Sequence, residues 1–121
     1  MQDKALKFHS EYPGKIQIVP THSFEGPEDL KMVYTPGMAY ATEEITKDKS
    51  DTYKYTWRKN SVAIVCDGTA VLGYGNIGPH AALPVMEGKS VVFSHFAGLS
   101  AIPLCVDTSS PEEVIKLVKQ I

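Results

Sequence analysis

Two short runs of apolar residues place the strongest limit on how this chain can fold. VAIVC occupies residues 62–66 and IPLCV occupies residues 102–106. Apolar runs without alternation are typical of strands covered on both faces, as in a parallel sheet between layers of helices. A third segment, KIQIV at 15–19, alternates apolar and polar residues and is interpreted as a strand ended by Pro20.

Helical patterns surround these strand candidates. Apolar residues recur at three- and four-residue spacing over 3–12 and 38–48, and Pro27 followed by two acids favours a helix over 27–34. Residues 79–97 are expected to form one or two helices, with Pro84 and Gly88 as possible breaks. Ser110, Pro111 and Glu113 form a capping-box pattern that begins a helix with an apolar stripe to residue 121. Residues 51–60 fit a short strand or an ordered loop equally well. The alternation predicts one α/β domain over 1–121 with a largely parallel sheet.

The composition excludes several classes of protein. A chain that is 43% apolar and 21% charged is an ordinary globular one, so disorder is not expected. The net charge of −2, with Arg58 as the only arginine, gives no basic patch for a nucleic acid. The first residues lack the basic start and long apolar run of a secretory signal, and no membrane segment is expected. We therefore expect a cytoplasmic protein.

The cysteines and histidines show no metal-site spacing. Cys66 and Cys105 each lie in one of the two apolar runs, where we expect free thiols buried on strands. The four histidines are dispersed, without an i, i+4 pair. We therefore predict no metal site within the chain.

A glycine-rich segment, GYGNIG at 73–78, has the spacing of a dinucleotide-binding loop. Such a loop should directly follow a strand and be followed about 20 residues later by an acid for the ribose. That later region reads VVFSH at 91–95, and the nearest acids, Glu87 and Asp107, are misplaced. A small nucleotide-binding module remains one alternative, but a tight turn that packs backbone against backbone is favoured.

Two further residues could carry chemistry. Tyr34 places a phenol at a predicted helix end beside Pro36 and Gly37, and Lys89 places an amine just before the apolar run at 90–93. Each residue alone is more often structural than catalytic.

The motifs around these two residues resemble those of one enzyme family. YTPGMA at 34–39, VAIVCDGTAVLGYGNIGPHAALPVMEGK at 62–89, FAG at 96–98 and LCVDTSSPEEV at 104–114 are similar to the N-terminal domain of a malic enzyme of the small prokaryotic type. The opening ALKFHSEYPGKIQIVP at 5–20 resembles the start of that domain. The resemblance implies a three-layer α/β/α fold with a short, mostly parallel sheet, of the kind that precedes the Rossmann domain in amino-acid dehydrogenases.

The same resemblance implies an activity, the oxidative decarboxylation of malate to pyruvate with NAD or NADP and Mg²⁺ or Mn²⁺. By match to the family motifs, Lys89 is the general base for the C2 hydroxyl and Tyr34 is the general acid for C3. A lysine that accepts a proton near neutrality needs a pKa below its ordinary value, through desolvation or a nearby cation. The apolar residues after Lys89 and the metal ion could provide this.

The resemblance also implies what the chain lacks. The family's dinucleotide-binding domain follows this region and is absent here, and acids such as Glu43, Glu44, Asp67 and Asp107 do not match its metal motifs. We therefore expect no cofactor or metal bound to this chain, no activity from it alone, and pairing into a homodimer, as in the family. The alternative is a stand-alone, non-catalytic domain that dimerises or regulates.

Overall fold

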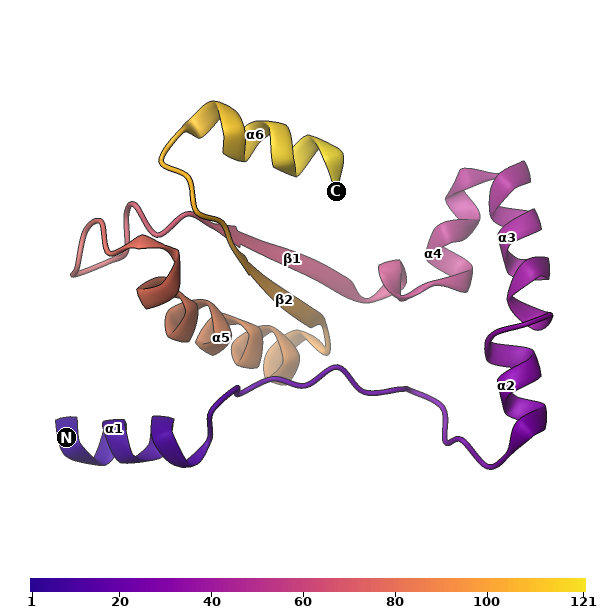
Figure 1. Ribbon diagram of the computed structural model, residues 1–121, viewed down its shortest axis with the longest axis horizontal. Coiled ribbons are helices and arrows are strands. Elements are labelled where there is room, and N and C mark those ends of the chain that lie inside the picture. Colours follow the sequence, from indigo (N-terminus) through magenta and orange to yellow (C-terminus); the bar gives the residue numbers. More distant parts are fainter. The chain divides into compact units, whose positions relative to one another are not determined.

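The two apolar runs form a parallel sheet in the computed structural model, which describes residues 1–121 (Figure 1). Strands β1 (Ser61–Cys66) and β2 (Ser100–Cys105) pair in register, from Ser61 opposite Ser100 to Cys66 opposite Cys105. Parallel neighbours need a long crossover connection, and helix α5 (Gly78–Ala97) provides it. The expected strands are therefore confirmed, and they begin one to two residues earlier than the apolar runs.

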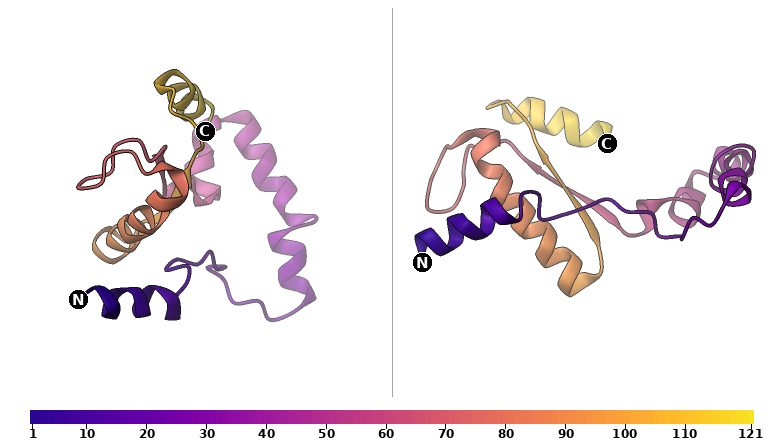
Figure 2. Two further views of the ribbon diagram at one scale, coloured as in Figure 1. Left: turned by 60° about the vertical axis from the view of Figure 1, so that its left-hand side comes forward. Right: turned by 60° about the horizontal axis from the view of Figure 1, so that its bottom comes forward.

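Helices lie on both sides of this sheet. α5 packs against β1 and β2 through a buried stripe one turn apart, formed by Ala82, Met86 and Ser90. The Ser90 hydroxyl donates to the Met86 carbonyl at 3.1 Å, so the one fully buried polar side chain is satisfied. Helix α6 (Pro111–Gln120) lies on the other side of the sheet (Figures 1 and 2). The predicted three-layer α/β/α arrangement is confirmed.

The start of α6 follows only half of the predicted capping box. Ser110 Oγ accepts a hydrogen bond from the Glu113 N–H at 3.3 Å, as an N-cap should. The Glu113 carboxylate does not return to the Ser110 N–H and instead accepts a hydrogen bond from the Thr108 hydroxyl. Thr108 Oγ1 in turn accepts from the Ser110 N–H at 3.1 Å, so Thr108 replaces Glu113 in that role.

The strand prediction for residues 15–19 is wrong. Helix α1 (Gln2–Glu11) ends as expected before Pro13 and Gly14, but the segment that follows is extended without a partner strand. Alternation alone identifies an extended segment, whereas a strand also needs a neighbour that accepts its hydrogen bonds. The sheet therefore has two strands where the sequence predicted at least three.

Contacts divide the chain into two units, and the sheet belongs to the unit made of Met1–Gln17 and Ser61–Ile121. All the regular elements of the other unit, Ile18–Asn60, are helical. It contains α2 (Pro27–Val33), α3 (Gly37–Lys47), α4 (Thr52–Tyr55) and the 3-10 turns Lys49–Asp51 and Trp57–Lys59. Residues 51–60 thus form helical turns, and neither the strand nor the loop reading was right.

The helical unit has no core of its own. None of its residues is buried, and large apolar side chains such as Ile18, Phe24 and Met32 are between 61% and 77% exposed. A segment of this size cannot offset the entropy of folding without burying apolar surface. Its helices must therefore be stabilised by surfaces outside these 43 residues.

The longest helix has many apolar residues, yet no helix of the chain is long and apolar enough to cross a membrane.

Candidate functional site

Tyr34 ends helix α2 and is held through its backbone. Its N–H donates to the Leu30 carbonyl at 2.9 Å, and its own carbonyl accepts from the Met38 N–H at 2.8 Å. The residue is 61% exposed, so its phenol does not belong to a core. The backbone of Tyr34 is thus fixed while its hydroxyl can meet a ligand or another surface.

The turn after Tyr34 depends on Gly37. The Thr35–Pro36 peptide bond is cis, and α3 begins directly at Gly37. A Cβ atom added at Gly37 would lie 2.3 Å from the Met32 carbonyl oxygen, which is closer than any side chain can approach. This explains why a glycine follows proline here, because only the missing side chain lets α3 start against the end of α2.

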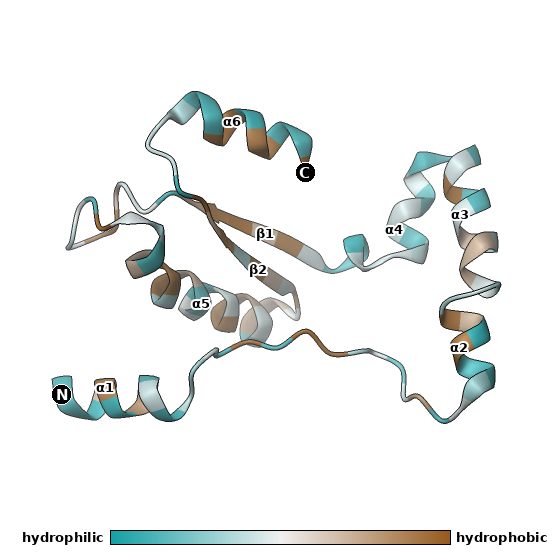
Figure 3. Ribbon diagram, viewed as in Figure 1, coloured by the Kyte–Doolittle hydropathy of each residue, from teal (hydrophilic) through white to brown (hydrophobic).

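Lys89 lies within α5 and is exposed. None of the chain's ion pairs includes Lys89, so its ammonium group has no carboxylate within the chain. Four apolar residues that lie three, four or seven positions from Lys89 along α5 are between 38% and 80% exposed: Val85, Val92, Phe93 and Phe96. Figure 3 shows such apolar residues on α5, interspersed with polar ones. A surface that covered these residues would desolvate the amine, which is what a lysine base needs.

An ion pair fixes the turn of α5 that carries Lys89. Glu87 Oε2 and Lys15 Nζ are 3.1 Å apart, and their side chains are only 14% and 15% exposed. The other three ion pairs join residues three or four apart on exposed helix surfaces, whereas this one joins positions 72 residues apart. It ties the segment after α1 to α5 two residues from Lys89, and removing one partner would leave a poorly solvated charge.

A groove of about 760 Å³ lies beside this ion pair. Its walls come from α1, from the segment after it and from one side of α5, and include Phe8, His9, Tyr12, Lys15, Pro84 and Gly88. Lys89 is not among the residues that line it. The side chain that the resemblance implies as the base is therefore not part of the groove wall, although the neighbouring Gly88 is.

The glycine-rich segment is a packing turn. Four of its N–H groups are already bonded to backbone carbonyls: those of Tyr74 and Gly75 to Val71, and those of Ile77 and Gly78 to Gly68. A phosphate-binding loop needs such N–H groups directed at the ligand. The structure thus favours the tight turn over the nucleotide-binding alternative.

Gly68 supplies a test of this packing. Its φ is +75°, and a Cβ atom there would lie 2.2 Å from the Gly78 carbonyl oxygen. We expect Gly68→Ala to destabilise the protein by roughly 2 kcal/mol or more, from left-handed backbone strain and the clash together. Thermal unfolding of the full-length protein measures this as a lower Tm.

Gly88→Ala is the matched control, because Gly88 lies within α5 with nothing within 4 Å of an added Cβ. There alanine should raise stability by about 0.5–1 kcal/mol, through its better helix propensity. Equal effects of the two substitutions would contradict the packing role of Gly68.

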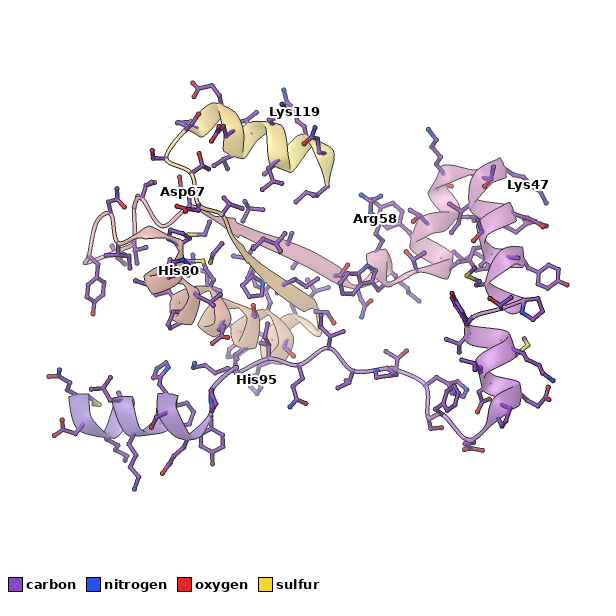
Figure 4. The ribbon with its side chains drawn as sticks, in the orientation of Figure 1. Lys47, Arg58, Asp67, His80, His95 and Lys119 are labelled. Carbon is purple, nitrogen blue, oxygen red and sulfur yellow. The ribbon has the colours of Figure 1, made fainter.

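The residues of this chain do not fit the divalent metal that the resemblance implies. No group of three or more His, Cys, Asp or Glu side chains could hold an ion. Asp67, which directly follows β1 (Figure 4), accepts hydrogen bonds from the N–H and the hydroxyl of Thr69 at 3.0 and 2.8 Å. These bonds, the backbone one first, lower the pKa of the Asp67 carboxyl. Asp67 thus holds its own turn, and His80 and His95 lie apart from each other at the two ends of α5 (Figure 4).

The chain is thus an α/β domain with an exposed amine at Lys89 and an exposed phenol at Tyr34. It has neither a nucleotide-binding loop nor a cluster of metal ligands. The family model for the N-terminal domain of malic enzyme matches residues 13–117. The NAD-dependent malic enzyme of Geobacillus stearothermophilus is 49% identical over 108 residues, which cover 89% of this chain and 23% of that protein. The NADP-dependent malic enzyme of Escherichia coli is 47% identical over 119 residues, which cover 98% of this chain and 16% of that protein.

A solved structure agrees. The crystal structure of malic enzyme from Pyrococcus horikoshii has a TM-score of 0.93 and 46% identity, and the match covers 99% of this chain and 28% of that one. The chain therefore belongs to the malic enzyme family and corresponds to its N-terminal domain. It spans less than a third of the length of these relatives.

The sequence suggests Tyr34 and Lys89 as candidate site residues but gives no sign of the contacts that hold them. Nothing in the sequence connects Lys15 to Glu87, which only the fold brings together. Gly37 and Gly68 had a visible signal, since each is part of a turn motif, but their close backbone contacts become evident only in three dimensions. Tyr34 and Lys89 themselves belong to different units. That they serve one site remains a prediction.

Proposed function

We propose that the full-length protein is a malic enzyme that oxidatively decarboxylates malate to pyruvate. The observation that supports this most is the match over nearly the whole chain, at 46–49% identity, to proteins named as NAD- or NADP-dependent malic enzymes and to a solved malic enzyme. The nicotinamide cofactor, held by another part of the full-length protein, supplies the oxidation. This chain supplies proton transfer.

Lys89 is the proposed general base. Its neutral Nζ accepts the proton of the C2 hydroxyl as the hydrogen on C2 leaves as hydride. A free lysine is almost fully protonated at neutral pH, so the base must be partly desolvated to act. The apolar side chains around Lys89 are suited to this once another surface covers them.

Tyr34 is the proposed general acid. Loss of carbon dioxide leaves the enolate of pyruvate, and the phenol of Tyr34 donates its proton to C3 to give the ketone. The fixed backbone and exposed side chain of Tyr34 are consistent with this role. A phenol is protonated at neutral pH and is therefore in the right state to donate.

The direct test is an assay of the full-length protein with malate, Mn²⁺ and either NAD⁺ or NADP⁺. We expect one pyruvate and one carbon dioxide for each reduced cofactor. Reduction of the cofactor with stable oxaloacetate as the product would indicate a simple malate dehydrogenase, and no turnover with either cofactor would contradict the proposal.

The isolated 121-residue chain is expected to be inactive with malate. Its glycine-rich segment has most of its N–H groups bonded internally, and its acids and histidines form no metal cluster. The same assay on the isolated chain checks this, with the full-length protein as the positive control. Turnover above background would mean that a dinucleotide site lies within these residues.

We also propose that the protein forms a homodimer in which this domain takes part. The outward apolar side chains of α5 and α6, including Phe96, Ile115 and Val118, support an interface, as does the coreless helical unit. A stable contact should bury more than roughly 1,000 Å². Sedimentation at tens of micromolar should give the mass of a dimer, and a monomer alone would contradict the proposal.

A further inference from the structure

Two thiols lie opposite each other at one end of the sheet. Cys66 is the last residue of β1 and Cys105 is the last residue of β2, and the strands pair them directly. Both are free and half-buried. No role proposed above uses either sulfur.

The strand geometry brings these two side chains to the same face. Paired residues of neighbouring parallel strands lie about 4.8 Å apart, within the Cα separation of about 4.4–6.8 Å that disulfides span. Side chains alternate along a strand, so Cys105 shares its face with Ala101, which is 7% exposed and is part of the core. The pair is thus sheltered from large molecules and open to small ones.

The backbone around Cys66 is ordered. The Val106 N–H donates to the Cys66 carbonyl at 2.8 Å and extends the ladder beyond the pair. The Gly68 N–H donates to Cys66 Sγ at 3.3 Å and so helps to hold this sulfur in place. Burial, followed by the charge of the neighbouring Cys66 thiolate, raises the pKa of the Cys105 thiol. Because Cys66 contributes to this shift, the two sulfurs interact electrostatically.

We propose that Cys66 and Cys105 form a dithiol site that a small peroxide oxidises to a reversible intramolecular disulfide. The Cys66 thiolate attacks one peroxide oxygen, the O–O bond breaks, and water leaves, which gives a sulfenic acid at Cys66. The Cys105 sulfur then attacks the Cys66 sulfur, the S–O bond breaks, and a second water leaves. In balance, two thiols and one hydrogen peroxide give one disulfide and two waters, and a dithiol reductant reverses the change.

The position of the pair makes closure and reopening feasible. Both cysteines are the last residues of their strands, so the loops that follow can absorb the roughly 1 Å by which the Cβ atoms must approach. A disulfide formed with such adjustment is more easily reduced than a relaxed one. It would join the strand ends from which the 67–77 and 106–110 loops leave.

Peptide mapping tests this proposal on the native full-length protein. Trypsin cleaves after Lys59, Lys89 and Lys116, which places Cys66 and Cys105 in the separate peptides 60–89 and 90–116. After treatment with hydrogen peroxide and blocking of free thiols, we expect these two peptides to be joined, two hydrogens lighter than their sum, and to separate on reduction. Cys66→Ser and Cys105→Ser should each abolish the joined species.

A second measurement does not depend on oxidation or on the serine variants. Phenylarsine oxide bridges two thiols that lie close together, so it should protect both cysteines of the untreated protein from alkylation until a dithiol displaces it. Two outcomes would overturn the proposal: peroxide that yields only sulfinic or sulfonic acid on unjoined peptides, or cysteines that phenylarsine oxide leaves open to alkylation.

Discussion

Replacing Lys89 with alanine in the full-length enzyme is expected to lower kcat for malate oxidation by roughly a thousandfold or more, within the range that a lost general base costs. No other amine replaces it, because Lys15, the other lysine held against α5, is paired with Glu87. The initial rate of cofactor reduction at saturating malate measures the effect.

Lys119→Ala is the matched control, since Lys119 is an exposed lysine in the last turn of α6 and is not part of the proposed site. It should leave kcat and the thermal unfolding unchanged. A Lys89→Ala enzyme that folds normally and retains near-normal turnover would show that Lys89 is only a solvated helix residue.

Tyr34→Phe should produce a different defect. The substitution removes only the hydroxyl that donates to C3, so hydride transfer and decarboxylation can proceed while the enolate waits for a proton. We expect protonation at C3 to slow by roughly a hundredfold or more. The most direct readout is exchange of the C3 hydrogens of pyruvate with deuterated water, catalysed by the enzyme in the presence of reduced cofactor.

In Tyr34→Phe, the rate of this exchange should fall far more than the steady-state rate at which the enzyme reduces oxaloacetate to malate. Tyr40→Phe is the control, because Tyr40 lies in the adjoining helix α3 and is similarly exposed, at 67% against 61%. Equal exchange rates in the Tyr34→Phe and Tyr40→Phe enzymes would remove Tyr34 from the chemistry.

The parts of the fold that the sequence predicted well are those with a local cause. The runs at 62–66 and 102–106 are apolar on both faces and became the paired strands, and Pro111 with its Ser110 N-cap began α6 as expected. The strand prediction for residues 15–19 was wrong because alternation is a local signal, whereas pairing with a neighbouring strand is not. The wrong reading of 51–60 has a similar cause, since three aromatic residues alternate there although the backbone forms helical turns.

The candidate site likewise has a part that the sequence suggested and a part that only the structure shows. Tyr34 and Lys89 were identified because the motifs around them resemble a family, and no spacing or periodicity alone would have distinguished them from other exposed residues. The contacts that hold these two residues could not be predicted from the sequence. The Lys15–Glu87 ion pair and the close approach of Gly37 to Met32 are tertiary or backbone contacts that no sequence pattern encodes. The resemblance therefore suggested the chemistry of Tyr34 and Lys89, and the structure added the contacts that hold their helices in place.

We propose that Tyr34 and Lys89 serve one malate-binding site. A crystal structure of the full-length enzyme with an unreactive malate analogue would test it most directly. We expect Lys89 Nζ to lie within about 3.2 Å of the oxygen on C2 and the Tyr34 hydroxyl to face C3, from the same subunit or from a second one. A structure in which Lys89 faces solvent far from every copy of Tyr34, with the analogue bound elsewhere, would contradict it.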